Sequence, residues 1–295
     1  MKKIGFMGMG LMGLPMAINI VKGLGEPILG YDVMADKRDQ FKKIGGNVTD
    51  KPLDVYKSCD IIFTCLPNHA VIIEVIEGII NNCKPETIIV DLSSTAPYII
   101  KGLYEKAIAA KMHLLDSPIS GGEPGAKAGT LAIMTGGEKE IFDEIKPLLD
   151  MIGEPVYTGP STTGSIAKLA NNIIAGVYLV AMTEGYAFAA KAGIDPELLF
   201  NATKSGFVGG PLYENKIPKL FNRDFEPGAR IAVHRKDIIN AKHLAHDMGV
   251  DLPLTDVLLH VMDWMDDNNM INEDQISMVK YYEKKMNTFV EKKTS

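Results

Sequence analysis

Short apolar runs alternate with amphipathic stretches through the first half of the chain. The runs are bounded by turn residues and predict buried strands at residues 2–7, 27–32, 61–65, 87–92, 113–116, 131–135 and 155–158. The amphipathic stretches predict helices at residues 34–44, 71–80, 97–110 and 139–152. Strands that alternate with helices are typical of a parallel sheet with helices on both faces.

The strand pattern ends at Gly164. Residues 165–192 form one long helical stretch that is apolar nearly all round, which predicts burial on several sides, between two domains or between subunits. The remainder, to about residue 282, predicts helices, one of them with an apolar stripe at Ile238, Ala241, Ala245 and Met248. We therefore expect an α/β chain with a Rossmann doubly wound sheet in residues 1–163. An all-helical substrate and oligomerisation domain follows in residues 164–295 and includes the interdomain helix.

A glycine motif, Gly8-Met9-Gly10-Leu11-Met12-Gly13, follows the first predicted strand and opens a helix. In this setting the first glycine allows a tight turn, the second lets a pyrophosphate approach the backbone, and the third lets helix and strand pack closely. The free N–H groups at the start of the helix then face the phosphates. The motif therefore predicts a dinucleotide coenzyme, which we expect to be bound by Gly8, Gly10, Leu11, Met12 and Gly13.

An acid closes the second predicted strand, because Asp32 lies nineteen residues after Gly13. A carboxylate at this place accepts hydrogen bonds from the ribose hydroxyls and repels a 2′-phosphate, which favours NAD over NADP. Lys37 and Arg38 follow on the next predicted helix. They lie either on its solvated face or within reach of a 2′-phosphate.

Polar clusters follow three of the predicted strands, where an open parallel sheet binds its ligands. In the segment Ser120-Gly121-Gly122, consecutive glycines let backbone N–H groups converge on an anion such as a small carboxylate. Ser94 offers a hydroxyl to a nicotinamide or a substrate, and it could equally cap the helix that begins near Pro97. Ordinary turns have the same composition, but three successive clusters favour a shared crevice.

The long apolar helix carries Lys168 and, four residues later, Asn172. Residues at this spacing share one helix face and can reach one ligand. Most lysines are solvated, but the neighbours of Lys168 are Ile166, Ala167 and Leu169, which leave no polar face. Half-burial would lower the pKa of this amine and make it a usable proton donor near neutral pH.

Charge and cysteine content narrow the possible partners and compartment. The 295 residues carry a net charge of −6 without a long basic block, which argues against nucleic acid as a partner. Three cysteines without a C-x-x-C pair suit a reducing cytoplasm. The apolar N-terminal run is interrupted by Pro15 and Asn19 and is not followed by a cleavage site, so we expect neither a leader nor a membrane span. No metal site is predicted.

Together these residues resemble the β-hydroxyacid dehydrogenase family over almost the whole chain. The similarity rests on the glycine motif, Asp91-Leu92-Ser93-Ser94, Asp116-Ser117-Pro118-Ile119-Ser120-Gly121-Gly122, the segment from Gly164 through Lys168 to Asn172, and Lys236-Asp237. Thr162 departs from the pattern, because a glycine usually stands there, and this should stiffen the entry to the long helix.

The resemblance implies hydride transfer between NAD(P) and a small carboxylated semialdehyde or β-hydroxyacid. Lys168 would be the catalytic acid or base, and Asn172 would help to hold the substrate. Ser120, Gly121 and Gly122 would bind the substrate carboxylate. Leu66, Pro67 and Ser94 would contact the nicotinamide side, and Lys236 would approach the cofactor from the second domain.

Several alternatives stay open at this level. Tartronate semialdehyde is the first choice of substrate, followed by 3-hydroxyisobutyrate, 2-(hydroxymethyl)glutarate and succinic semialdehyde. A non-catalytic dinucleotide-binding module is a rival from another class. A second rival is an enzyme with the same architecture that reduces imines or decarboxylates a sugar acid phosphate. The apolar long helix suggests packing between subunits, so we expect a homodimer or homotetramer.

Overall fold

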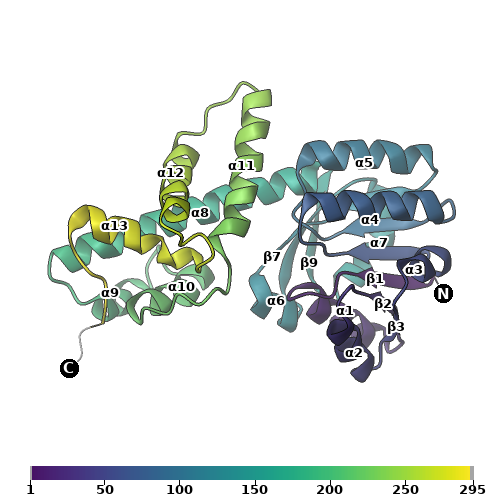
Figure 1. Ribbon diagram of the computed structural model, residues 1–295, viewed down its shortest axis with the longest axis horizontal. Coiled ribbons are helices and arrows are strands. Elements are labelled where there is room, and N and C mark those ends of the chain that lie inside the picture. Colours follow the sequence, from purple (N-terminus) through teal and green to yellow (C-terminus); the bar gives the residue numbers. More distant parts are fainter. Residues whose placement is uncertain (1, 293–295) are drawn as a thin grey trace. The chain divides into compact units, whose positions relative to one another are not determined.

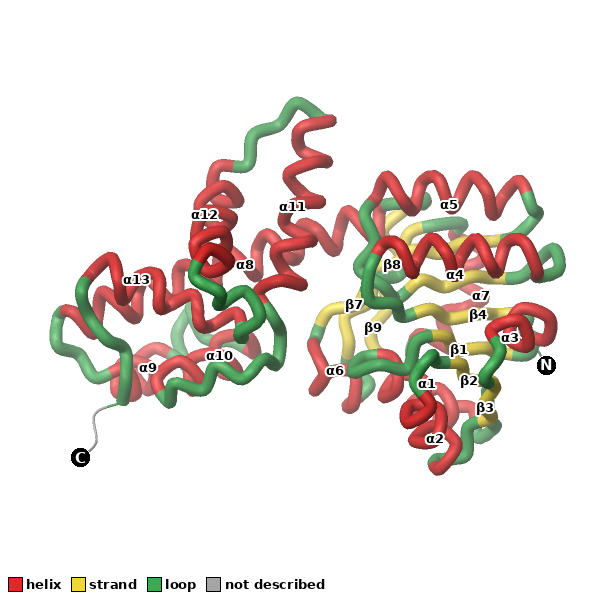
Figure 2. Tube along the Cα trace, in the orientation of Figure 1, coloured by secondary structure: helices red, strands yellow, loops and turns green. Residues whose placement is uncertain are grey.

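The structure is a computed structural model that describes residues 2–292. It divides into two compact units (Figures 1 and 2). Unit 1 ends at Lys168 and unit 2 begins at Leu169. The sequence placed the domain boundary at residues 163/164, five residues earlier on the same helix.

Unit 1 is built on one sheet, with the strands in the spatial order β3-β2-β1-β4-β5-β6-β8-β7, and β9 also paired with β8. The strands are β1 (Ile4–Met7), β2 (Leu29–Tyr31), β3 (Asn47–Thr49), β4 (Ile61–Thr64), β5 (Ile88–Asp91), β6 (His113–Asp116), β7 (Ile119–Ser120), β8 (Leu131–Gly136) and β9 (Gly153–Gly159). Strands β1 to β6 are parallel, as the sequence predicted. Strand β8 runs antiparallel to β6, because the chain reverses through β7 and α6 instead of crossing over the sheet.

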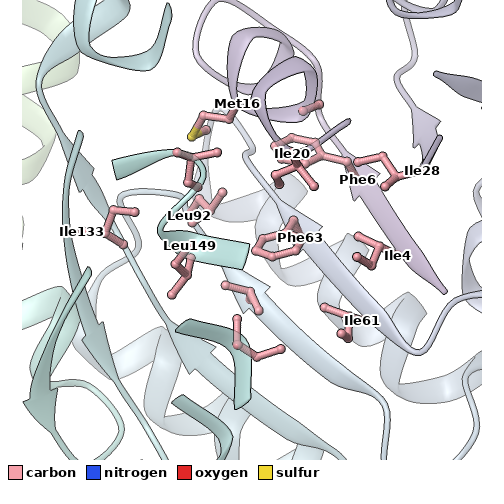
Figure 3. Packing of buried hydrophobic residues seen from close by; sticks show 14 of the residues in the cluster. Ile4, Phe6, Met16, Ile20, Ile28, Ile61, Phe63, Leu92, Ile133 and Leu149 are labelled. Carbon is pink, nitrogen blue, oxygen red and sulfur yellow. The ribbon is translucent and has the colours of Figure 1, made fainter. Parts of the chain in front are cut away.

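Side-chain alternation along the strands creates two cores, one on each face of the sheet. Phe6, Phe63 and Val90 point to one face, where they pack with α1, α2, α6 and α7. Figure 3 shows Phe6 and Phe63 among other buried residues of this core. Ile62 and Ile89, from alternate positions of the same strands, point to the other face and pack with α3, α4 and α5. The buried strands therefore read as continuous apolar runs, as is typical of a sheet covered on both sides.

The helices of unit 1 are α1 (Gly13–Leu24), α2 (Ala35–Lys43), α3 (Pro52–Ser58), α4 (His69–Asn82), α5 (Pro97–Ala109), α6 (Gly122–Ala128) and α7 (Lys139–Leu149). The sequence pattern missed four short elements, which are β3, α3, β7 and α6. Strands β3 and β7 have two or three residues and none is fully buried, and helices α3 and α6 have seven residues each, about two turns, so none of the four shows a clear hydrophobic period.

Helix α8 (Thr163–Lys191) is continuous and belongs to both units. By length and apolar composition alone, this helix could cross a membrane. The core helices of soluble proteins meet the same two criteria, and nearly half of the most apolar stretch of α8 is buried in the protein. Unit 2 adds α9 (Pro196–Thr203), α10 (Pro211–Phe221), α11 (Ile231–Asp247), α12 (Pro253–Asp267), a 3₁₀ turn η1 (Gln275–Met278) and α13 (Val279–Met286). The second domain is thus helical, as predicted.

One detail of the predicted stripe on α11 is wrong. Ile238, Ala241 and Ala245 are buried in unit 2, but Met248 is exposed. Met248 is the C-cap residue of α11, and the helix ends at Asp247, so the helical period no longer places its side chain on the buried face.

Candidate coenzyme and catalytic site

The three motif glycines fill three different geometric roles at the carboxyl end of β1. Gly8 has φ = 92°, and a Cβ atom there would lie 2.3 Å from the carbonyl oxygen of Cys65. A Cβ atom at Gly13 would lie 1.9 Å from the carbonyl oxygen of Gly8, so helix and strand meet without room for a side chain. Gly10 borders open space, with nothing within 4 Å of a Cβ atom. This is the arrangement that lets a pyrophosphate approach the backbone.

The first turn of α1 lacks a side-chain cap, because its N-cap residue is Met12. Its leading N–H groups therefore suit phosphate oxygens, and the helix dipole favours the negative charge. Leu11 is exposed beside them. Together with the space at Gly10, these groups fit the pyrophosphate of a dinucleotide.

Asp32 lies directly after β2 and is buried. One carboxylate oxygen accepts from the N–H of Met9 at 2.6 Å, and the other accepts from the N–H of Met34 at 2.8 Å. The acid is thereby fixed against the glycine loop. The Arg38 guanidinium donates to the carbonyl oxygens of Asp32 and Val33 at 2.6 and 3.2 Å, so it lies beside the acid and not on a solvated helix face.

The loops after β4 and β5 are tied together by one hydroxyl. The N–H of Leu66 donates to Ser93 Oγ at 2.9 Å, and this contact sets the Leu66-Pro67 turn. Ser93 is buried, so its hydroxyl holds this turn in place. Ser94 is half-buried. The capping role considered for Ser94 is wrong, because Ala96 occupies the N-cap position of α5.

The anion-binding segment predicted after β6 forms a sharp turn. Gly121 has φ = 139° and Gly122 has φ = 63°, and both are exposed where the chain passes from β7 into α6. The side-chain amide of Asn19 on α1 donates to the carbonyl oxygen of Ala126 on α6 at 2.9 Å. The helix that follows the glycine turn therefore packs against the helix that follows the glycine loop.

Lys168 is half-buried in the second turn of α8. The start of this helix is held by the buried carboxylate of Asp116, the last residue of β6. Asp116 accepts from the N–H of Thr162 at 2.9 Å and from the N–H of Ser165 at 2.7 Å. Burial raises the pKa of the Asp116 carboxyl group to about 6, although both N–H groups act in the opposite direction.

Asn172 lies in unit 2 and is also held by a carboxylate. Its side-chain amide donates to Asp237 Oδ2 on α11 at 2.9 Å, and its side-chain oxygen accepts from Asn171 at 3.1 Å. His234 Nε2 donates to the backbone carbonyl oxygen of Asn172 at 2.8 Å. Lys236 forms an ion pair with Asp237 at 3.2 Å, and its approach to a coenzyme stays a prediction.

The structure thus gathers most of the predicted residues in unit 1. The glycine loop, Asp32, the Leu66-Pro67 turn, Ser94, the Ser120-Gly121-Gly122 turn and Lys168 lie there, and Asn172 and Lys236 lie in unit 2. Sequence reasoning gave no role to Asp116 or Asp237. The only available signal was their position, at a strand end and beside Lys236. Among residues 2–292, no group of three or more His, Cys, Asp or Glu side chains could hold a metal ion.

A doubly wound sheet with this loop at its switch point, followed by a helical domain, defines a dinucleotide-dependent oxidoreductase. Comparison with protein families agrees. Residues 3–162 match the NAD binding domain of 6-phosphogluconate dehydrogenase, and residues 162–282 match the NAD-binding domain of NADP-dependent 3-hydroxyisobutyrate dehydrogenase. The chain belongs to the NAD(P)-dependent β-hydroxyacid dehydrogenase family.

Individual relatives support this assignment. The chain is 34% identical to 2-hydroxy-3-oxopropionate reductase of Escherichia coli, over 86% of this chain and 87% of that protein. It is 31% identical to 2-(hydroxymethyl)glutarate dehydrogenase of Eubacterium barkeri, over 95% of both chains. The structure of 3-hydroxyisobutyrate dehydrogenase from Mycobacterium tuberculosis with L-serine superposes with a TM-score of 0.85 at 26% identity, covering 95% of this chain and 99% of that one.

Proposed function

We propose that this enzyme reversibly reduces a small carboxylated semialdehyde to the corresponding β-hydroxyacid, with Lys168 as the proton donor. The observation that carries the proposal is the position of Lys168, three residues after Ser165, whose N–H is held by Asp116 at the carboxyl end of β6. The glycine loop and the Ser120-Gly121-Gly122 turn follow strand ends of the same unit. Ligands of such sheets bind at the carboxyl ends of the strands.

The proposed chemistry needs one mobile proton beside the carbonyl group. The bound nicotinamide would supply the hydride that adds to the carbonyl carbon. Negative charge then develops on the carbonyl oxygen, and the Lys168 ammonium would stabilise this charge and donate the proton. In the oxidative direction the neutral amine would accept the proton of the alcohol. Asn172, one helical turn further along α8, would hold the substrate beside Lys168.

The substrate carboxylate would be bound at the turn formed by Ser120, Gly121 and Gly122. Both glycines lack the side chains that would cover their N–H groups, and both are exposed. The Ser120 hydroxyl adds a donor to the backbone groups. The Mycobacterium tuberculosis relative was determined with L-serine, which is itself a carboxylate with a hydroxyl group on its β-carbon.

NAD is the proposed coenzyme in preference to NADP. The buried Asp32 carboxylate would repel a 2′-phosphate and would accept hydrogen bonds from ribose hydroxyls with its remaining lone pairs. Arg38 lies next to Asp32, but its guanidinium is engaged with two backbone carbonyl oxygens. Both contacts use the Nη1 atom of Arg38, so a preference for NADPH would need its other guanidinium N–H groups to outweigh the charge of Asp32.

Tartronate semialdehyde is the proposed substrate. Similarity to the Escherichia coli 2-hydroxy-3-oxopropionate reductase supports this choice, and the comparable similarity to the Eubacterium barkeri enzyme supports 2-(hydroxymethyl)glutarate as the second candidate. Steady-state assays at the NADH absorbance band with these two compounds, 3-hydroxyisobutyrate and succinic semialdehyde, each with both coenzymes, test the choice. A kcat/KM for another compound tenfold above that for tartronate semialdehyde would overturn it.

The role of Lys168 is tested by Lys168→Met, which keeps an unbranched side chain as far as Cε and removes the amine. We expect turnover to fall by roughly two to four powers of ten, the contribution of a positioned proton donor, while NADH binding is retained. Near-normal turnover of Lys168→Met would show that Lys168 takes no part in the chemistry. If the wild type oxidises no NADH with any of these substrates, a non-catalytic binding module would be favoured instead.

We further propose a homodimer or homotetramer. Ile174 and Phe188 leave large apolar side chains exposed on α8, and Leu198 does so on α9. Exposed apolar surface of this kind favours contact with another subunit. Light scattering coupled to gel filtration tests this proposal, and a monomeric mass at micromolar concentration would contradict it.

A further inference from the structure

We propose that Asp116 is a positioning residue, whose carboxylate holds the first turn of α8 against the end of β6 and thereby sets the direction of the Lys168 side chain. The inference rests on the role proposed above for Lys168. Asp116 does not touch the reacting groups in this proposal. It acts through the helix that carries Lys168.

The contacts of Asp116 replace an ordinary helix cap. Thr162 occupies the N-cap position of α8, because its carbonyl oxygen accepts from the N–H of Ile166 at 2.9 Å. An N-cap side chain normally accepts from the N–H two or three residues later. Here the N–H of Ser165 donates instead to Asp116 Oδ2, and the N–H of Thr162 donates to Asp116 Oδ1. The cap therefore comes from the sheet, and it fixes the helix to the sheet.

Two glycines bring the helix start into direct contact with the strand ends. A Cβ atom at Gly164 would lie 2.2 Å from the carbonyl oxygen of Asp116, and one at Gly136 would lie 2.7 Å from Asp116 Oδ1. No side chain can therefore separate α8 from β6 and β8 at this point. A change in the Asp116 contacts is passed directly to the backbone of the first turn.

The backbone at the helix entry is strained, which makes the contacts of Asp116 necessary. Thr162 has φ = 81°, a left-handed conformation that β-branched residues rarely adopt and that is energetically unfavourable for them. Such a conformation persists only where its surroundings hold it. Asp116 accepts a hydrogen bond from the N–H of Thr162 itself, so its carboxylate helps to hold the strained residue in place.

Lys168 is close enough along the helix to respond to this geometry. It follows Ser165 by three residues, about one turn and about 4.5 Å along the helix axis. Residues at this spacing lie on the same side of a helix. A reorientation of the first turn therefore moves the Lys168 amine, and a misplacement of about 1 Å can cost a catalytic group about a hundredfold in rate.

The test compares Asp116→Ala and Asp116→Asn in two backgrounds, the wild type and Lys168→Met. Hydride transfer is followed under single-turnover conditions with excess enzyme, which keeps small residual rates measurable, and the panel substrate with the highest kcat/KM is used. In the wild-type background we expect Asp116→Ala to lower this rate by roughly ten- to a hundredfold, with NADH affinity changed by less than about threefold. Asp116→Asn keeps one acceptor oxygen and should restore part of the rate.

In the Lys168→Met background we expect Asp116→Ala to have little further effect, because residues that act as one unit are not additive. An equal loss in both backgrounds, or an unchanged rate in the wild-type background, would overturn the positioning role. If Lys168→Met itself keeps normal turnover, the proposed function fails instead, and the two failures are thus distinguished.

Two further variants separate positioning from general loss of stability. Asp195 caps α9 by accepting from the N–H groups of Glu197 and Leu198 at 2.9 and 3.1 Å, so Asp195→Ala removes a similar cap in unit 2. This control should lower Tm while it leaves the hydride-transfer rate within about twofold. Thr162→Gly relieves the strained φ angle and should restore part of the rate lost in Asp116→Asn. A rate loss as large in Asp195→Ala as in Asp116→Ala, or no restoration by Thr162→Gly, would contradict the proposal.

Discussion

Asp91 and Asp116 are register partners on the adjacent parallel strands β5 and β6, so two buried carboxylates project from the same face of the sheet where the strands end. Asp91 accepts from the hydroxyls of Thr64 and Thr95 at 2.9 and 2.6 Å and from the N–H of Ser93 at 3.1 Å. It therefore shapes the loop that carries Ser94, whereas Asp116 holds the helix that carries Lys168.

The glycine motif predicts opposite outcomes for two alanine substitutions. Gly10→Ala meets no neighbouring atom in the protein, so we expect Tm to change by no more than about 2 °C, while NADH affinity falls at least about tenfold because the methyl group would block the pyrophosphate. Gly13→Ala forces its Cβ atom against the Gly8 carbonyl oxygen and should lower Tm strongly or prevent folding. Thermal unfolding and NADH fluorescence titration measure both effects. Unaltered NADH affinity in Gly10→Ala would place the phosphates elsewhere.

Asp32 predicts a change of coenzyme preference. The substitution Asp32→Ser removes the charge that repels a 2′-phosphate and weakens the hydrogen bonds to the ribose hydroxyls of NADH. Because hydrogen bonds to charged groups contribute about 1.5–3 kcal/mol, we expect the ratio of kcat/KM for NADH to that for NADPH to fall by roughly ten- to a hundredfold. Steady-state kinetics with both coenzymes give this ratio.

Arg38 supplies the control for the coenzyme experiment. Because Arg38 lies beside Asp32, the gain in NADPH use should be lost when Arg38→Gln is added to Asp32→Ser. Asp36→Asn, which removes an exposed acid from the same helix, should leave the preference unchanged. A wild-type enzyme that already prefers NADPH would refute the assignment of NAD.

Asp116 predicts a pH dependence of folding stability. Burial raises the pKa of its carboxyl group from 3.8 to about 6 in the folded protein, so the folded state binds this proton more tightly than the unfolded chain. The resulting stabilisation is fully present below about pH 4 and is lost as the pH rises through about 6. We expect the free energy of unfolding of the wild type, relative to Asp116→Asn, to fall by roughly 2 kcal/mol between about pH 4 and pH 7.

Urea unfolding of the two proteins across this pH range measures the effect. Asp91 on β5 and Lys168 on α8 are ionisable groups on elements that contact β6. Repeating the urea unfolding with Asp91→Asn and with Lys168→Met shows whether either group contributes to the pH dependence of stability. A stability difference that stays constant over the range would show that Asp116 titrates as an ordinary carboxyl group.

Asp237 predicts an effect on substrate binding. It accepts from the Asn172 amide, so Asp237→Ala should let that side chain rotate and raise the KM for the semialdehyde about tenfold or more, the worth of a hydrogen bond to a charged group. Asp237→Asn retains an acceptor oxygen and should have a smaller effect. If Asp237→Ala leaves KM unchanged, Asn172 does not hold the substrate.

Much of unit 1 could be predicted because its physical causes are local in the sequence. A run such as Ile61–Thr64 is apolar at every position because both faces of the sheet are covered. The glycine motif predicts a tight turn, since only glycine leaves room for the backbone carbonyl oxygens that lie against Gly8 and Gly13. The antiparallel direction of β8 could not be predicted, because a strand's residues do not encode the direction of its neighbour.

The sequence by itself predicted the residues to which we assign the chemistry: the glycine loop, the acid after β2, the glycine turn after β6, and a lysine and an asparagine one helical turn apart. Only the tertiary structure decided what holds them. The contacts from Asp116 to Ser165 and from Asp237 to Asn172 join residues 49 and 65 positions apart. Buried carboxylates bind whichever N–H groups the folded chain brings to them, and no sequence period records that choice.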